Sequence, residues 1–392
     1  MSIYLDHAAT TPLRPEALEA MLPYLTDHFG NASSPHAAGR RARQGLDEAR
    51  EGIASILGAK PREIVFTSGG SEADNLAIKG AAWAASAKGR HIVTSAVEHK
   101  AVLHAAAILE RSGFEITVVP VDRYGRVDPE EVDSAINEHT TLVSIMYANN
   151  EVGTIQPIAE IGAICRRRGV LFHTDAIQAG GYLPLDVDNL GVDLLSLAAH
   201  KLYGPKGVGA LFVRQGTALL PQIQGGAQER QRRAGTENVA GIVGFARALE
   251  LAQADPAARD AENARLAGLR DRLLGAVRDL PGVELSGHPV ERLPHSASWL
   301  IDAVEGGDLV AALDLEGVEG STGSACTSGS AEPSHVLLAM AIPAQRAHGA
   351  LRLTAGRGTS SPDVDRAAEV LRSAIGRMRR PEVPQPDAVA SA

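Results

Sequence analysis

The sequence predicts an α/β fold, with a large domain whose mostly parallel sheet is covered by helices and a smaller α+β domain after it. The chain has 392 residues, more than one hydrophobic core usually supports, so about two domains are expected. Between about residues 60 and 215, short apolar runs alternate with longer helical patterns. This alternation is typical of βαβ units and a parallel sheet.

Short apolar runs mark the predicted strands of the large domain. They are residues 63–67, 91–95, 114–119, 142–146, 170–174 and 192–197. An Ala- and Leu-rich helix is predicted over 71–85, directly after the first strand. Cys165 falls within another helical pattern, where a core position is expected.

The smaller domain begins where the pattern changes, near Asp255-Pro256. Asp at an N-cap with Pro at the first helical position is a helix start, and Pro281-Gly282 is a stop, so a helix is predicted over 257–280. A β-like piece follows at 296–301. We expect a large domain over 11–255, a small domain formed by 1–10 with 256–380, and a disordered tail over 381–392.

Composition narrows the class of protein. A formal net charge of -9 and a pI near 5.8 disfavour direct binding to nucleic acid or to an anionic membrane. Two cysteines cannot form a disulfide framework, which favours a reducing compartment. No signal peptide and no run of about 20 apolar residues is evident, so we expect a cytoplasmic protein. The histidine and cysteine spacing predicts no metal site.

The turn Thr67-Ser-Gly-Gly-Ser-Glu-Ala-Asp74 lies between a predicted strand and a predicted helix. Its glycines permit a tight turn, and the helix start at Ser71 offers free N–H groups and a favourable dipole to an anion such as phosphate. The alternative is an ordinary Gly-rich turn with a Ser cap, because neither common nucleotide-binding pattern is present.

Asp175 and Lys201 each follow a predicted strand. Ligand sites in open α/β sheets lie at the carboxyl ends of strands, so the two side chains are expected to face one crevice. A lysine, a carboxylate and a phosphate-binding turn are what pyridoxal phosphate requires. Without other observations, an Asp–Lys ion pair with a surface lysine remains the alternative.

Three further residues could carry chemistry. Cys326 lies in a run of small polar residues that predicts an exposed, mobile loop, which suits a nucleophile that must travel. His99 could cap a helix, occupy the core or lie against a flat ligand. Arg352 could bind a carboxylate through two hydrogen bonds, or only pair with a surface acid.

Together these segments resemble the cysteine desulfurases, the NifS/IscS branch of the fold-type I, class V aminotransferase-like enzymes that use pyridoxal phosphate. The resemblance runs from Tyr4-Leu-Asp-His-Ala-Ala-Thr-Thr-Pro12 to about Arg380. Its most specific motifs are Phe66-Thr-Ser-Gly-Gly-Ser-Glu-Ala-Asp-Asn75, Asn149-Asn-Glu-Val-Gly153, His173-Thr-Asp-Ala-Ile-Gln178, Ala199-His-Lys-Leu-Tyr-Gly-Pro-Lys-Gly207, Arg233-Ala-Gly-Thr236 and Gly323-Ser-Ala-Cys-Thr327.

The resemblance implies how the large domain would bind pyridoxal phosphate. Lys201 corresponds to the lysine of the Schiff base, Asp175 to the partner of the pyridine nitrogen, and His99 to the histidine stacked on the ring. The other implied contacts are Asn150 and Gln178 at the phenolic oxygen, and Gly70, Ser71 and His200 at the phosphate. Thr236 corresponds to a residue that reaches the neighbouring subunit's phosphate, which implies a homodimer.

The resemblance also implies the reaction, which converts L-cysteine to L-alanine and leaves the sulfur as a persulfide on Cys326. Lys201 would act as the general base. Arg352 would bind the substrate carboxylate, with Asn31 as a further substrate contact. The sulfur then goes to an acceptor protein, for iron–sulfur clusters, thio-cofactors or tRNA, which the sequence does not name.

The chain departs from the family beside the lysine. The family usually has Ser-Gly-His-Lys, whereas this chain has Ala198-Ala-His-Lys201, so one hydrogen bond to the phosphate is missing. This change is the only feature that favours one alternative, a catalytically idle homologue that relays sulfur. The other alternative is another enzyme of the same fold with the same lysine and aspartate (a selenocysteine lyase, a cysteine lyase or an aminotransferase). The family's C-terminal extension for docking a scaffold protein is not recognisable in 381–392.

Overall fold

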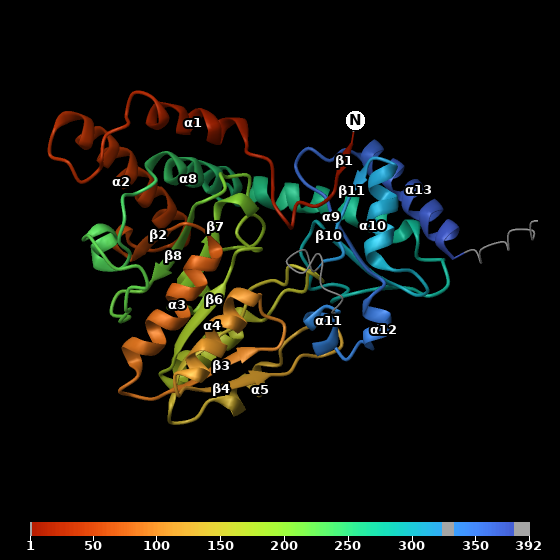
Figure 1. The fold of residues 1–392 in the computed structure, drawn as a ribbon, viewed down its shortest axis with the longest axis horizontal. Coiled ribbons are helices and arrows are strands. Elements are labelled where there is room, and N and C mark those ends of the chain that lie inside the picture. The colour runs from red at the N-terminus through yellow and green to blue at the C-terminus, as the bar shows by residue number, and fades with distance from the viewer. Residues whose placement is uncertain (1, 324–332, 380–392) are drawn as a thin grey trace, which may run out of the picture.

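The computed structural model of the chain describes residues 2–323 and 333–379. Cys326 and the predicted tail at 381–392 lie outside these ranges. The described residues form a large unit around one sheet and a smaller unit around two shorter sheets, which lie side by side in Figure 1. The predicted α/β class is confirmed.

The large unit is built on a seven-stranded sheet of order β2-β8-β7-β6-β5-β3-β4. Its strands are β2 (Ile64–Thr67), β3 (His91–Ser95), β4 (Glu115–Val119), β5 (Thr140–Ser144), β6 (Leu171–Asp175), β7 (Leu194–Ala198) and β8 (Gly209–Val213). Strands β4, β3, β5, β6 and β7 are parallel, and β8 runs antiparallel to both β7 and β2. The mostly parallel sheet is therefore confirmed, and β8 is a strand that was not singled out in the sequence.

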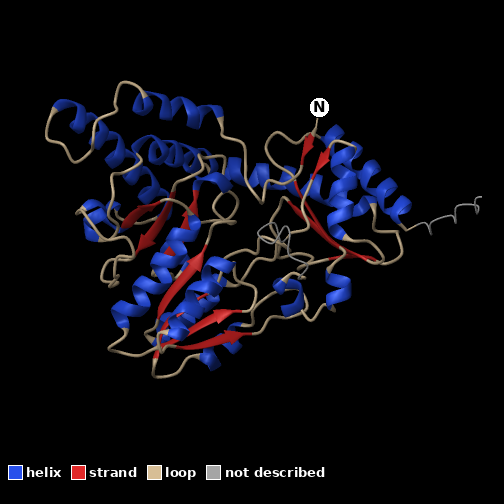
Figure 2. Ribbon diagram, in the orientation of Figure 1, coloured by secondary structure: helices blue, strands red, loops and turns tan. Residues whose placement is uncertain are grey.

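Helices cover both faces of this sheet (Figure 2). One face packs against α3 (Gly70–Ala85) and α4 (Lys100–Arg111) through residues such as Val65 and Leu194. The other face packs against α2 (Ala37–Leu57), α6 (Ile158–Arg168) and α8 (Val239–Gln253) through the alternate residues, such as Phe66 and Leu195. The alternation follows from the two-residue period of a strand. The remaining helices of the unit are α1 (Pro15–Leu25), α5 (Pro129–Ala135) and α7 (Val187–Leu190), with short 3₁₀ turns η1 (Pro61–Glu63), η2 (Ala199–Lys201) and η3 (Gln228–Gln231).

The smaller unit contains an antiparallel sheet of order β12-β10-β9 and a parallel pair of β1 with β11. Its strands are β1 (Ile3–Tyr4), β9 (Val283–Leu285), β10 (Ser296–Ile301), β11 (Val318–Glu319) and β12 (Ala350–Thr354). Its helices are α9 (Pro256–Ala276), α10 (Gly306–Leu315), α11 (His335–Ala339), α12 (Ala344–Ala347) and α13 (Ser361–Met378). The pairing of β1 with β11 joins the N-terminal residues to this unit, while the limits at 11, 255 and 380 remain predictions.

Two sequence expectations can be compared closely with the structure. The helix predicted to run to residue 280 ends at Ala276, where Val277 leaves helical backbone angles (φ -123°, ψ 2°); Val277 is buried in the core of the smaller unit, and Leu280 packs against that core. Cys165 is buried in the core of the large unit, as predicted, and burial raises the pKa of its thiol to about 12. Within the described residues, no helix combines the length and apolar character that crossing a bilayer requires.

Candidate active site

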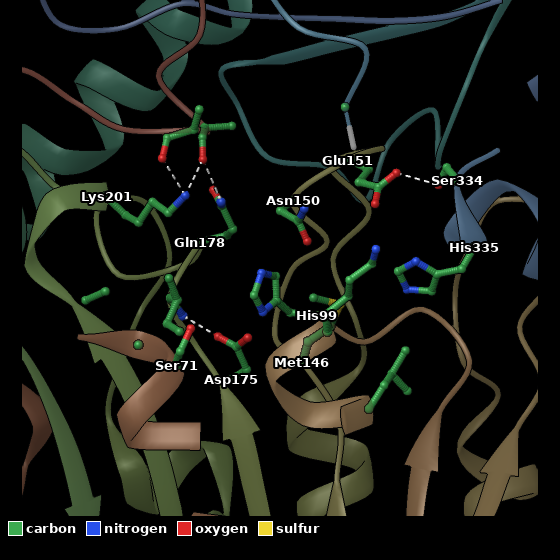
Figure 3. Close-up of a pocket in the computed structure, with 18 of the residues that line it drawn as sticks. Ser71, His99, Met146, Asn150, Glu151, Asp175, Gln178, Lys201, Ser334 and His335 are labelled. Carbon is green, nitrogen blue, oxygen red and sulfur yellow. Dashed lines mark hydrogen bonds between the residues drawn. The ribbon is translucent and has the colours of Figure 1, made fainter. Parts of the chain in front are cut away.

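A cavity of about 630 Å³ opens at the carboxyl ends of the parallel strands (Figure 3). Its size lies within the range of small-molecule sites. It is lined by most of the residues that the sequence singles out, namely Gly70, Ser71, His99, Asn150, Asp175, Gln178, His200, Lys201 and Arg352. Asn31 and Thr236 are exposed and do not line it within this single chain.

Asp175 is the last residue of β6, directly beside β7. Its side chain is buried, and one of its oxygens accepts a hydrogen bond from the Ile177 backbone N–H at 2.9 Å. Burial raises the pKa of this carboxyl to about 6, although the Ile177 amide and the charge of Lys201 act to lower it. A cationic group in the cavity would lower the pKa further and would be held by the carboxylate.

Lys201 ends the 3₁₀ turn η2 that follows β7. Its Nζ donates to the backbone carbonyls of Ala8 and Ala9 at 2.6 and 2.8 Å, as the dashed lines in Figure 3 show. Gln178 Nε2 donates to the same Ala8 carbonyl at 2.9 Å. The N-terminal segment thus lines the cavity beside the lysine, an arrangement that side-chain motifs could not reveal because the partners are backbone atoms.

The N-terminus of α3 forms another side of the cavity. Gly70 and Ser71 begin this helix of 16 residues, and the first N–H groups of a helix have no intrahelical partner. A Cβ at position 70 would lie 2.2 Å from Ile177 Cδ1, so any larger residue there would require the Ile177 side chain to move. His200 faces the same cavity, with Nδ1 3.1 Å from Thr10 Oγ1, and burial lowers its pKa to about 4. The charge that this region offers a phosphate therefore comes from the helix terminus.

His99 combines two of the roles that its sequence left open. It caps α4, since its Nδ1 accepts a hydrogen bond from the Ala101 N–H at 3.1 Å, and its ring also lines the cavity (Figure 3). Burial and the charge of Lys201 lower the pKa of the imidazole. A neutral, flat ring is therefore fixed across the cavity from Ser71.

Arg352 lies on β12 of the smaller unit, and only 2% of its side chain is exposed. Its guanidinium donates to an oxygen of Asp6 at 2.7 Å, to the Asn150 carbonyl at 2.6 Å and to the Gly323 carbonyl at 3.2 Å. The three acceptors belong to segments far apart in the chain, and together they hold the guanidinium in the lining of the cavity. Asp6 was not singled out in the sequence.

The segment that carries Cys326 is bordered by cavity residues. Gly323 on one side and Pro333 and Ser334 on the other line the cavity. Ser334 donates a hydrogen bond to a carboxylate oxygen of Glu151 at 2.5 Å (Figure 3). Cys326 itself lies outside the described residues, so its role stays a prediction.

The donor set fits pyridoxal phosphate. A primary amine, a buried carboxylate, a flat imidazole and a helix N-terminus meet in one cavity of suitable size, and each matches one part of that molecule. Lys100 also lines the cavity. Among the residues that the structure describes, no group of three or more His, Cys, Asp or Glu side chains is placed to bind a metal ion.

Comparison with known proteins agrees with this chemistry. Residues 3–367 match the aminotransferase class-V family. Cysteine desulfurase IscS of Methanosarcina thermophila is 51% identical over 378 residues, covering 96% of this chain and 93% of the relative. Cysteine desulfurase IscS of Dictyoglomus turgidum is 53% identical over 378 residues, covering 96% and 95%.

The fold is also that of solved relatives. A structure described as a NifS-like protein superposes with a TM-score of 0.89 at 36% identity, covering 96% of this chain and all of the other. DndA from Streptomyces lividans superposes with a TM-score of 0.75 at 36% identity, covering 90% of this chain and 99% of the other. By sequence and by fold, the chain belongs to the aminotransferase class-V family.

Proposed function

We propose that the cavity around Lys201 converts L-cysteine to L-alanine and that the sulfur passes to Cys326. The family and the relatives at about half identity make the protein a pyridoxal-phosphate-dependent cysteine desulfurase. The observation that supports the residue assignment is the single cavity that holds Lys201, Asp175 and Arg352 and is bordered by Gly323 and Pro333, on either side of Cys326.

Pyridoxal phosphate, when bound, supplies an electron-withdrawing ring that takes up negative charge from the substrate. Lys201 would hold it through its amine, and Asp175 would keep its ring nitrogen protonated. His99 would cover the ring. The remaining contacts would be Asn150 and Gln178 at the phenolic oxygen and Gly70, Ser71 and His200 at the phosphate.

The other steps belong to the chain's own groups. Arg352, which Asp6 holds in place, binds the substrate carboxylate. The Lys201 amine removes the Cα proton as general base. The Cys326 thiolate attacks the substrate sulfur, so the carbon–sulfur bond breaks and a sulfur–sulfur bond forms. The remaining three-carbon fragment takes up two protons, one at Cα and one at Cβ, which equal in number those released from Cα and from the thiol, and it leaves as alanine. L-Cysteine and the thiol thus become L-alanine and a persulfide.

Other chains are expected to take part in two ways, as a neighbouring subunit that completes the cofactor site and as a protein that accepts the sulfur. Thr236 is exposed, which suits contact with the phosphate in the neighbouring subunit of a homodimer. Asn31 is exposed as well and is kept as a further substrate contact. The persulfide sulfur would go to an acceptor protein in the cytoplasm, for iron–sulfur clusters or for thiolated cofactors and tRNA.

Cysteine replacement tests the proposed reaction. Cys326→Ala should keep the visible absorbance of bound cofactor but form neither persulfide nor alanine, whereas Cys165→Ala removes the buried thiol and should leave both products. Alanine and pyruvate are both measured as products, since pyruvate would indicate elimination or transamination instead of desulfuration. Full turnover by Cys326→Ala would exclude Cys326 as the nucleophile, and protein that stays colourless with added cofactor would favour the idle homologue.

Mixed dimers test the sharing of sites. Lys201→Ala and Thr236→Ala each damage both sites of their own homodimer, but a hybrid of the two contains one site with an intact lysine and an intact threonine. Mixing the variants under conditions of subunit exchange should therefore restore activity at limiting cofactor. No recovery in hybrids verified by native mass spectrometry would refute the shared site.

A further inference from the structure

The segment between β8 and α8 contains an unusual turn. Three consecutive residues other than glycine, Glu229, Arg230 and Gln231, have left-handed backbone angles, with φ of 48°, 56° and 64°. Residues with a Cβ adopt this conformation at a cost in free energy, and then usually one at a time. Such a turn persists only where the surrounding structure holds it in place.

A buried ion pair holds this turn. The two terminal nitrogens of Arg50, on α2, donate to the two carboxylate oxygens of Glu229 at 2.6 and 2.8 Å, and the side chains are 4% and 2% exposed. The Phe66 backbone N–H of β2 donates to the same carboxylate at 3.0 Å. Arg50 also donates to the Ile64 carbonyl at 2.8 Å. The turn is therefore fixed to the edge of the large sheet.

A buried ion pair contributes little to stability relative to an apolar pair of the same size, and removing one partner leaves the other charge buried and unpaired. Its geometry, however, is directional, since both oxygens of the carboxylate meet the planar guanidinium. The Arg50–Glu229 pair is thus better suited to fixing a backbone position than to adding stability.

The chain beyond the turn is held at a second point. Arg233 Nε donates to a carboxylate oxygen of Glu72, in the first turn of α3, at 2.8 Å. Ala234 is buried, and its N–H donates to the Ile223 carbonyl at 3.2 Å. The next N–H, of Gly235, donates to Gln228 Oε1 at 3.1 Å. Thr236 follows directly and is exposed, and α8 begins three residues later with Asn238 as its cap, so the position of Thr236 is set by the held segment before it together with the start of this helix.

We infer that the left-handed turn 229–231, held by Arg50, positions Thr236 for contact with a second copy of this chain. This inference rests on the proposed function, in which Thr236 reaches the phosphate of the neighbouring subunit's cofactor. Arg50 and Glu229 do not line the cavity, so they are positioning residues rather than catalytic ones.

A matched pair of variants at Arg230 tests the inference, because this exposed side chain lies in the middle of the turn. Arg230→Gly and Arg230→Val remove the same charge, but glycine adopts left-handed angles freely and a β-branched residue does not. The glycine variant should bind pyridoxal phosphate within about twofold of the parent. The valine variant should bind it about tenfold more weakly, the ratio for one lost hydrogen bond to a charged acceptor.

The readouts are the dissociation constant of pyridoxal phosphate, the dimer dissociation constant from sedimentation, and hydrogen exchange over residues 223–236. Equal cofactor affinity in the two folded variants would overturn the inference. If the valine variant does not fold, Glu229→Gln replaces it, and its unweakened cofactor binding would overturn the inference in the same way.

Thr236→Ala separates this inference from the proposed function. If Thr236→Ala and Arg230→Val both weaken cofactor binding while Arg230→Gly does not, both proposals are supported. If Thr236→Ala alone weakens binding, the shared site stands and the role of the turn is refuted. If Thr236→Ala binds the cofactor as tightly as the parent, the shared site fails first.

Discussion

The two sides of the cavity are assembled in different ways. The floor, formed by Gly70, Asp175, Ala198 and Lys201, comes from adjoining strand ends and helix starts of one sheet. The wall, formed by Asp6, Arg352 and the carbonyls of Ala8 and Ala9, joins segments far apart in sequence; Arg352 and Asp6 are separated by 346 positions. The floor is thus set within one sheet, and the wall depends on how the smaller unit packs on it.

The comparison implies a division of labour. Groups on the floor are placed to bind the cofactor and to move protons, so their loss should lower kcat or cofactor affinity. On the wall, Arg352 is proposed to bind the substrate carboxylate and Asp6 to hold Arg352, so the loss of either should mainly raise KM.

The largest effect is expected on the floor. Asp175→Asn keeps the shape of the side chain but removes the negative charge that would keep the ring nitrogen protonated, so kcat for alanine formation should fall about a hundredfold or more. The control is Asp193→Asn, because Asp193 directly precedes β7, at the end of the strand opposite the cavity, and contacts Arg214 and the Phe172 N–H. Equal kcat values in the two variants would contradict the division.

A smaller effect, on KM, is expected on the wall. Arg352→Lys keeps the charge but loses the paired N–H donors, so KM for L-cysteine should rise about tenfold while kcat changes less. Asp6→Asn should raise KM by a smaller factor, because the guanidinium keeps its bonds to the Asn150 and Gly323 carbonyls. Initial rates over a range of cysteine concentrations measure both constants. A fall in kcat at unchanged KM would indicate that Arg352 acts in the chemical step, as the residues of the floor are expected to, and not in binding the substrate.

Ala198→Ser should strengthen cofactor binding at the floor of the cavity. Ala198 lines the cavity where the resemblance expects a serine hydroxyl on the phosphate, so the variant should bind pyridoxal phosphate more tightly by up to about tenfold. Ser71→Ala should weaken binding by a similar factor. Cofactor titration of apoprotein gives both constants, and unchanged or weaker binding in the serine variant would show that the phosphate lies elsewhere.

The smallest effect is expected on the stability of the folded protein, through the buried carboxyl of Glu98. Burial raises the pKa of Glu98 from 4.5 to about 8, so the folded protein keeps a proton that the unfolded chain releases, and stability from this group is lost as the pH rises between these values. Glu98→Gln removes the titration while keeping an oxygen for the Ser95 hydroxyl and the Met146 N–H.

Thermal unfolding from pH 5 to pH 8 measures this contribution. The difference in Tm between Glu98→Gln and the parent should grow in favour of the variant as the pH rises, by roughly 1 °C for each kcal/mol of relieved penalty in a chain of 392 residues. Parallel Tm curves for the two proteins would contradict the raised pKa.

The sequence predicted the floor better than the wall for a physical reason. Asp175 and Lys201 follow strands whose apolar pattern is strong, and the carboxyl ends of parallel strands must meet at one edge. Lys201 donates to backbone carbonyls, and because every residue has one, the sequence cannot indicate which residues supply them. The placement of β8 between β2 and β7 likewise depends on a chain reversal whose outcome is decided by packing.

Of the residues of the wall, the sequence pointed to Arg352 as a possible carboxylate ligand, but not to its partners. The segment from Tyr4 to Pro12 belongs to the family resemblance, but nothing in its composition identifies Asp6 as the partner of Arg352. Glu151 lies within the motif Asn149–Gly153, and its hydrogen bond with Ser334 depends on the packing of α11 against the large unit. Contacts between units are set by tertiary structure rather than by local pattern.

Identification of the residue that bonds to the cofactor tests the central claim most directly. The holoenzyme is reduced with borohydride, digested and mapped by mass spectrometry, which retains the cofactor on the lysine that carried it. We expect the label on Lys201 alone. A label on Lys100, which also lines the cavity, or on any other residue would contradict the assignment of the active site.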